Sequence, residues 1–105
     1  MSIGDQNLEN ANYYGYEAQS NQLIEECAEL IQAVNKYRRA STGLGQDTNT
    51  KKAIALGNLV EELADVEIMV EQVKHLLQIP EEDILAVKQY KINRTKERIE
   101  EKKIL

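Results

Sequence analysis

The sequence predicts an all-α fold, a bundle with three main helices in each chain. The chain has 105 residues, of which 42% are hydrophobic and 30% charged, a balance typical of one soluble domain with a modest core. It contains one Pro, five Gly and neither Trp nor Phe, so residues typical of hairpin-rich folds are scarce. Apolar residues recur instead at intervals of three and four, the period of an amphipathic helix. We therefore expect residues 1–105 to form a single helical domain.

The first expected helix spans residues 17–39. Residues 1–12 before it are polar and lack the helical period, so a loose N-terminal arm is expected there. Residues 41–52 after it contain Gly43 and Gly45 and no apolar period, which predicts a loop. The apolar stripe of this first helix consists of Leu23, Cys27, Leu30, Val34 and Tyr37.

The second and third helices are expected over residues 53–77 and 80–102. Pro80 suits the first position of a helix, and the three acidic residues after it favour the positive end of the helix dipole. The second helix carries an apolar stripe of Leu59, Leu63, Val66, Val70, Val73 and Leu77. The third has a narrower seam of Leu85, Ile92 and Ile99.

Three helices of this length carry more apolar surface than a single three-helix layer hides. A homodimer would cover the excess by completing a four-helix core from two chains, with the third helices packed outside it. A homo-oligomer is therefore expected.

The charge and cysteine content exclude several classes of partner and setting. The net charge of −5 and the pI near 4.9 repel a phosphate backbone, so duplex nucleic acid is not an expected partner. A single cysteine forms no internal disulfide, and no signal segment opens the chain. No apolar run approaches the roughly 20 residues that span a bilayer. A cytoplasmic protein outside the membrane is expected.

Acidic residues interrupt the apolar stripes of the first two helices. The first helix contains Glu25, Glu26 and Glu29, and the second contains Glu62 and Asp65. A three-residue offset puts Glu26 and Glu29 one turn apart on the same strip of their helix, and Glu62 and Asp65 repeat this offset. If the two helices pack antiparallel, both pairs of acids face the same gap.

Four carboxylates in one gap repel each other strongly, and a divalent cation relieves this repulsion. Hard oxygen ligands favour Mg²⁺, with Mn²⁺ as a substitute. The alternative is that these acids are surface charges paired with Lys or Arg four residues later. No basic residue occupies those positions, which hold Glu29, Leu30, Ala33, Val66 and Met69. The metal interpretation is therefore favoured.

The pattern Glu25-Glu26-x-x-Glu29 followed by Glu62-x-x-Asp65 resembles the EExxE and ExxD motifs of the MazG-like all-α nucleoside triphosphate pyrophosphohydrolases. The resemblance implies a dimer or tetramer that converts a nucleoside triphosphate and water to the monophosphate and pyrophosphate. It also implies that Mg²⁺ is bound by Glu26, Glu29, Glu62 and Asp65, and that Glu25 orients the attacking water or helps to bind a further ion. One departure is the separation between the motifs, residues 30–61, which is longer than in compact members.

Two further groups of residues are candidates for substrate contacts. Lys91, Asn93, Arg94 and Arg98 are similar to a late Lys, Asn and Arg segment of that family that touches phosphates; the alternative is a solvated basic face. Tyr13, Tyr14 and Tyr16 offer an aromatic face for a nucleobase; the alternative is an N-terminal staple that packs on the bundle.

Other functions remain open on the sequence alone. A phosphoribosyl-ATP pyrophosphohydrolase would use the same bond chemistry on the same scaffold. A non-enzymatic regulatory or scaffold dimer would use the acids to bind a basic partner, and Mg²⁺ would not stabilise it. A di-iron carboxylate bundle needs Glu-x-x-His pairs, and His75 has Gln72 three residues before it, so this class is set aside.

Overall fold

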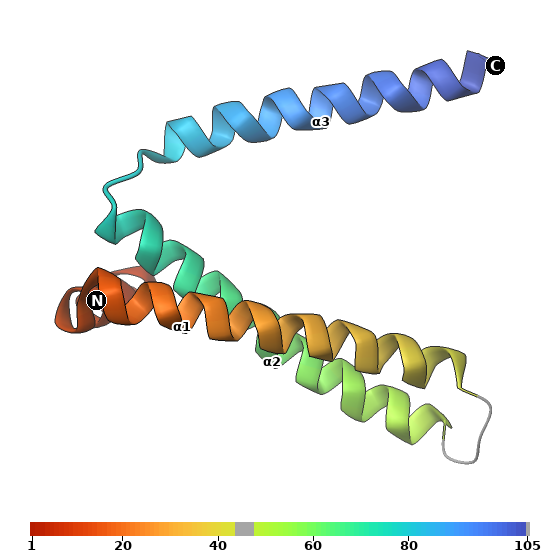
Figure 1. Cartoon of the computed structure of the whole chain (residues 1–105), viewed down its shortest axis with the longest axis horizontal. Coiled ribbons are helices and arrows are strands. Elements are labelled where there is room, and N and C mark those ends of the chain that lie inside the picture. Colours follow the sequence, from red (N-terminus) through yellow and green to blue (C-terminus); the bar gives the residue numbers. More distant parts are fainter. Residues whose placement is uncertain (44–47, 105) are drawn as a thin grey trace.

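The computed structural model describes residues 1–43 and 48–104 and contains three α-helices. They are α1 (Ile3–Thr42), α2 (Thr48–Leu76) and α3 (Glu81–Ile104), and no strand occurs within the described residues. α1 and α2 run antiparallel side by side, whereas α3 projects away from this pair (Figure 1). The all-α class and the three main helices are thus confirmed. The expected loop over residues 41–52 is shorter, because helix continues to Thr42 and resumes at Thr48, and residues 44–47 lie outside the described part.

The prediction of a loose N-terminal arm over residues 1–12 is wrong, because helix α1 begins at Ile3. Ser2 caps the helix: its Oγ accepts a hydrogen bond from the backbone N–H of Asp5 at 3.0 Å. At Gly15 the backbone leaves the helical region, with φ 85° and ψ 171°. α1 therefore consists of two helical segments, 3–14 and 16–42, that change direction at this glycine.

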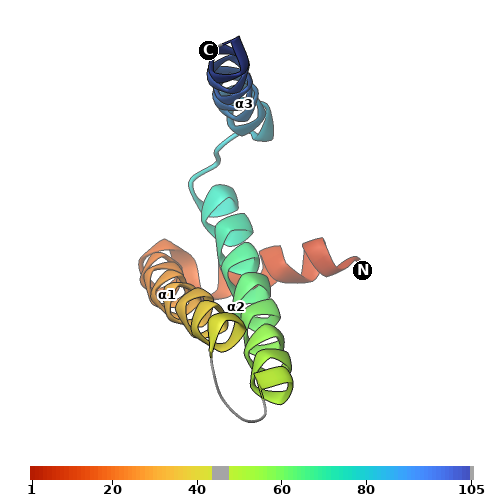
Figure 2. The ribbon, with the colours of Figure 1, turned by 90° about the vertical axis from the view of Figure 1, so that its right-hand side faces the viewer.

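A network of amide side chains holds the segment 3–14 against α2. In the view of Figure 2, this segment and the rest of α1 lie on different sides of α2. Gln72 of α2 is 3% exposed; its Nε2 donates to Asn7 Oδ1 at 2.7 Å, and its Oε1 accepts from Gln19 Nε2 at 2.7 Å. Asn7 Nδ2 also donates to the backbone oxygen of Ile68 at 3.1 Å. Buried amides with satisfied hydrogen bonds fix one arrangement of the segments they join.

Among the described residues of the α1–α2 pair few are buried, and three of the five that are buried are alanines. Alanines at a helix contact let the two backbones approach closely, but they bury little apolar area. Large apolar side chains on another side of α2 stay between 39% and 58% exposed. The buried residues within the described part of the chain are Ala11, Ala33, Ala55, Met69 and Gln72, and the exposed apolar side chains of α2 include Leu56, Val60, Leu63 and Val70.

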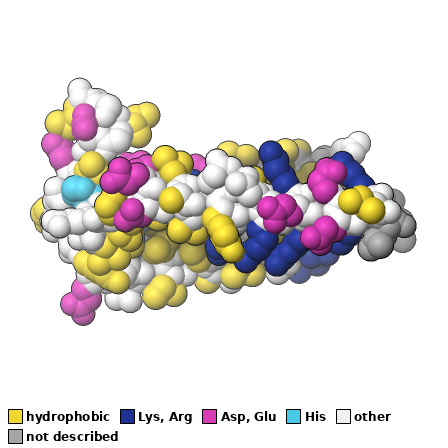
Figure 3. Space-filling model, turned by 90° about the horizontal axis from the view of Figure 1, so that it is seen from above, with side chains coloured by type: hydrophobic (Ala, Val, Ile, Leu, Met, Phe, Trp, Pro, Cys, Tyr) yellow, Lys and Arg dark blue, Asp and Glu magenta, His cyan; other side chains and the backbone are white. Residues whose placement is uncertain are grey.

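α3 has no buried residue and packs against neither α1 nor α2. An ion pair between Lys74 Nζ and Glu81 Oε2, 2.9 Å long, joins its first turn to the end of α2. Lys and Arg side chains gather over the half of the molecule that holds the C-terminal part of α3 (Figure 3). Among the described residues, no helix combines the length and apolar character that crossing a bilayer requires.

Two glycine substitutions test the break in α1. Gly15→Ala is expected to lower the free energy of unfolding by about 1–3 kcal/mol, because positive φ with extended ψ is a region that essentially only glycine adopts. Gly57→Ala in α2 is expected to raise it by about 1 kcal/mol, because alanine favours a helix and its Cβ meets no atom within 4 Å. Urea unfolding followed by circular dichroism measures both values. Equal effects of the two substitutions would contradict a bend at Gly15.

Candidate functional site

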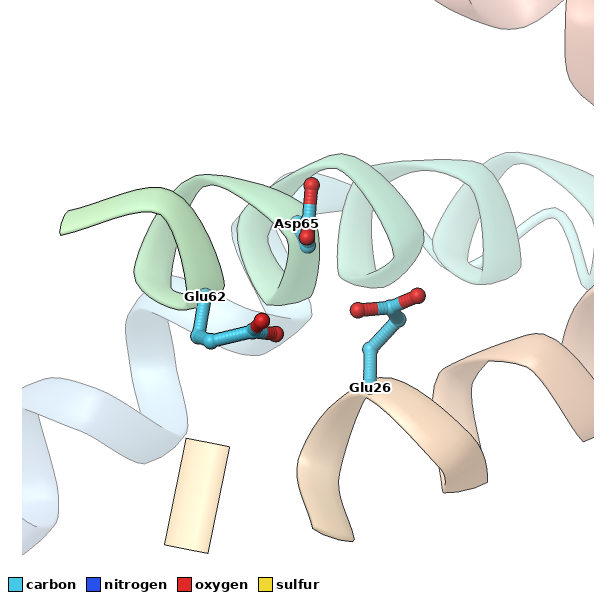
Figure 4. A group of neighbouring side chains, drawn as sticks. All are labelled: Glu26, Glu62 and Asp65. Atoms are coloured by element: carbon cyan, nitrogen blue, oxygen red, sulfur yellow. The ribbon is translucent and has the colours of Figure 1, made fainter. Parts of the chain in front are cut away.

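Three of the predicted acidic residues converge between α1 and α2. Glu26 reaches from α1 toward Glu62 and Asp65 of α2 (Figure 4). One carboxylate oxygen of each residue lies within 4.8 Å of those of the other two, and all three residues are half-buried. The antiparallel pairing of the helices produces this arrangement, because the three-residue offset on α2 presents two acids to the same turn of α1.

Two oxygens of this cluster are buried without a hydrogen-bond partner, Glu26 Oε2 and Glu62 Oε2. The other oxygen of Glu26 accepts from Gln22 Nε2 at 2.7 Å. Among the described residues, no Lys or Arg forms an ion pair with any of the three carboxylates. Buried acceptors without donors are costly, so this geometry suits a bound cation.

The electrostatics of the cluster favour protonation when no cation is bound. Burial raises the pKa of Glu62 above its ordinary value of 4.5, and the charges of Glu29, Asp65 and Glu26 raise it further. Burial also raises the pKa of Asp65 above 3.8, with a second contribution from Glu26. A divalent cation would reverse these effects, because it stabilises the charged carboxylates.

The remaining two predicted acids, Glu29 and Glu25, are not members of the group of three. Glu29 is exposed and falls outside the tight group of three, but it is close enough to raise the pKa of Glu62. Glu25 is also exposed and lies outside that group. Three of the four predicted ligands are therefore gathered, with Glu29 beside them.

A hollow of about 300 Å³ adjoins Glu29 and Glu62, and we call it the Lys36 hollow. The sequence interpretation missed its polar residues Lys36, Gln32 and Asn58. Helical spacing contains the signal for two of them, because Lys36 follows Glu29 by seven residues and Asn58 precedes Glu62 by four. The lining residues are Glu29, Gln32, Ala33, Lys36, Asn58 and Glu62.

Within one chain, the structure does not bring the predicted phosphate-binding residues to the carboxylates. All of them are exposed on α3, which packs against neither helix of the cluster. The guanidinium of Arg94 lies 5.9 Å from the ring centroid of Tyr90. The four residues concerned are Lys91, Asn93, Arg94 and Arg98.

The three tyrosines predicted to contact a nucleobase lie at the break in α1. Tyr13 and Tyr14 pack edge to face with ring centroids 4.9 Å apart, and both remain largely exposed, whereas Tyr16 is 44% exposed. None of them lines the Lys36 hollow. A second hollow, of about 470 Å³, lies between the segment 3–14 and α2, and the tyrosines do not line it either. Its lining includes Asn7, Asn10, Ala64, Ile68 and Gln72.

No protein-family model matches the chain, and no curated protein or solved structure is significantly similar to it. The case for a function therefore rests on the arrangement of its own side chains. The strongest feature of that arrangement is the group of three carboxylates with two unpaired buried oxygens.

Proposed function

We propose that this protein is a Mg²⁺-dependent nucleoside triphosphate pyrophosphohydrolase, which converts a nucleoside triphosphate and water to the monophosphate and pyrophosphate. The observation that carries the proposal is the convergence of Glu26, Glu62 and Asp65 within 4.8 Å, with unpaired buried oxygens on two of them. Clustered ionisable groups with raised pKa values are typical of functional sites. The motifs that contain these acids also resemble the EExxE and ExxD motifs of the MazG-like pyrophosphohydrolases, which supports the same reaction.

The donor set fits magnesium. Glu26, Glu62 and Asp65 would hold the ion, with Glu29 beside them, and carboxylate oxygens are the ligands that Mg²⁺ and its substitute Mn²⁺ prefer. When bound, the ion supplies positive charge that offsets the charge on phosphate oxygens and polarises the phosphorus. The carboxylates of α1 and α2 also fix where the triphosphate is held relative to the attacking water.

Glu25 is the proposed base that orients this water. It is exposed to solvent and precedes Glu26 in the chain. The water oxygen forms a bond to the α-phosphorus, the bond from that phosphorus to the α–β bridging oxygen breaks, and pyrophosphate leaves. Glu25 accepts the proton that the water loses.

The proposed assembly is a homo-oligomer, a dimer or tetramer, in which the α1–α2 pairs of two chains form a four-helix core. Exposed apolar side chains on α2, among them Leu56, Leu63 and Val70, would meet their counterparts across the interface. In this assembly α3 of one chain is the source of phosphate contacts for the site of another. Those contacts are assigned to Lys91, Asn93, Arg94 and Arg98.

Product analysis tests the proposed function. Purified protein with Mg²⁺ is expected to release pyrophosphate and a monophosphate in equal amounts from a panel of nucleoside triphosphates, measured by anion-exchange chromatography. Mg²⁺ is also expected to raise the melting temperature, because it binds the folded carboxylate cluster more tightly than the unfolded chain. Chelation of the metal should abolish both effects.

Other products would identify other functions. Release of orthophosphate alone from a triphosphate would contradict the proposal. Hydrolysis restricted to phosphoribosyl-ATP would assign the chain to that related reaction. Absence of both hydrolysis and Mg²⁺-dependent stabilisation would favour a regulatory or scaffold dimer whose acids bind a basic partner.

A further inference from the structure

The Lys36 hollow lies directly beside the carboxylate cluster; it shares Glu62 with the cluster and is also lined by Glu29. Its remaining polar groups differ in kind from these carboxylates. Lys36 offers an ammonium group, and Gln32 and Asn58 offer amide N–H donors, so the hollow combines hydrogen-bond donors from both helices. Among the described residues Lys36 forms no ion pair, so its ammonium group is free to bind an anion.

The charge of the α1–α2 pair changes sign at this hollow. Residues 17–35 and 53–72, which form most of the two helices, contain nine acidic residues and no Lys or Arg. The described residues 36–43 and 48–52, at the end of α1 and the start of α2, contain five Lys or Arg and no Asp or Glu. A polyphosphate near the cluster is therefore attracted toward this basic end and repelled from the opposite direction.

A magnesium-bound triphosphate keeps net negative charge after the ion binds, so it needs donors that the carboxylates cannot supply. We propose that the Lys36 hollow binds the β- and γ-phosphates of the substrate, and hence the pyrophosphate product, through Lys36, Gln32 and Asn58. This inference rests on the proposed function and adds a phosphate-binding group from the same chain as the carboxylates. It also gives the substrate a direction.

The direction follows from the residue that the hollow and the cluster share. With the terminal phosphates beside Lys36, the α-phosphate would lie at the carboxylates, because Glu62 belongs to both the hollow and the cluster. The nucleoside would then extend from the cluster away from the basic end of the α1–α2 pair.

Lys36→Gln tests this assignment, with Lys52→Gln as a matched control. Both substitutions remove one positive charge from the basic end, but Lys52 does not line the hollow. Titration calorimetry with inorganic pyrophosphate and Mg²⁺ is expected to show an affinity about 10- to 100-fold lower for Lys36→Gln, because charge-assisted hydrogen bonds are lost. Nucleoside monophosphate affinity should stay unchanged, and Lys36→Arg should retain pyrophosphate binding.

The outcomes separate this inference from the proposed function. If the wild type hydrolyses triphosphates and Lys36→Gln binds pyrophosphate as tightly as Lys52→Gln does, the assignment is overturned and the function stands. If the wild type hydrolyses nothing but binds magnesium pyrophosphate more tightly than Lys36→Gln does, the function fails and the hollow remains a polyphosphate site. A wild type that binds no pyrophosphate overturns the assignment.

Discussion

Glu62→Gln is expected to lower the Mg²⁺-dependent hydrolysis rate by about 10²- to 10³-fold while making the metal-free protein more stable than the wild type. The first effect follows because a Lewis acid contributes several kcal/mol to the transition state, and each 1.36 kcal/mol is tenfold in rate. The second follows because the substitution removes a half-buried charge that three neighbouring acids repel. Initial rates and thermal unfolding in chelator measure the two effects.

The same substitution should change how stability depends on pH. The pKa values of Glu62 and Asp65 are higher in the folded chain than in the unfolded chain. At a pH between the unfolded and the folded pKa of either residue, the folded state therefore binds more protons than the unfolded state. The metal-free wild type therefore loses stability as pH rises from the ordinary carboxyl values of 3.8 and 4.5 through the raised ones. It regains that stability as pH falls. Glu62→Gln should reduce the change in the free energy of unfolding with pH.

Glu97→Gln on α3 is the matched control, because it removes the same charge from an exposed position outside the cluster. It should leave hydrolysis and the metal-free stability close to those of the wild type. Hydrolysis by Glu62→Gln at the rate of Glu97→Gln would show that the cluster does not hold the metal. Lower metal-free stability of Glu62→Gln than of the wild type would show that the carboxylates do not repel each other.

Hydrophobic periodicity predicted the three helices, but it did not predict which faces are buried in one chain, since Leu85, Ile92 and Ile99 of α3 stay between 48% and 55% exposed. It also failed for the N-terminal segment, where polar contacts fix the structure. The segment 3–14 has no apolar stripe, yet Ser2 caps it and Asn7 ties it to Gln72. Pairing of amides distant in sequence leaves no periodic signal, so the sequence pattern predicts a loose arm here. The bend at Gly15 depends on a positive-φ backbone conformation, and the presence of a single glycine in the sequence does not predict it.

The candidate site was predictable where it depends on spacing within one helix and unpredictable where it depends on how helices are placed. Glu62 and Asp65 share a strip of α2, and a single antiparallel contact brings Glu26 to them. Lys36 was missed because its role depends on the hollow beside that contact rather than on a motif. The position of α3 was not predictable, because α3 packs against neither α1 nor α2 and a short link after Leu76 joins it to the pair.

Leu63→Glu, on the exposed apolar side of α2, is expected to dissociate the proposed oligomer. Leu63 is 46% exposed in the single chain, so a charge there does not disrupt the fold of one protomer but would be buried in a four-helix core. Ile54 precedes Leu63 by nine residues, two and a half helical turns, and so lies on the opposite side of α2. It is 62% exposed, which makes Ile54→Glu a matched substitution away from the proposed interface.

Light scattering coupled to size-exclusion chromatography should find a dimer or tetramer for the wild type and for Ile54→Glu, and a monomer for Leu63→Glu. Circular dichroism should find the same helix content in all three, because neither residue is buried in the single chain. Hydrolysis should fall with dissociation, because the phosphate contacts assigned to α3 would come from another chain, whereas α3 packs against neither helix of its own cluster. A Leu63→Glu variant that stays assembled would show that the oligomer interface lies elsewhere on the protein. A monomeric wild type would show that there is no such interface. Either result would contradict the four-helix core.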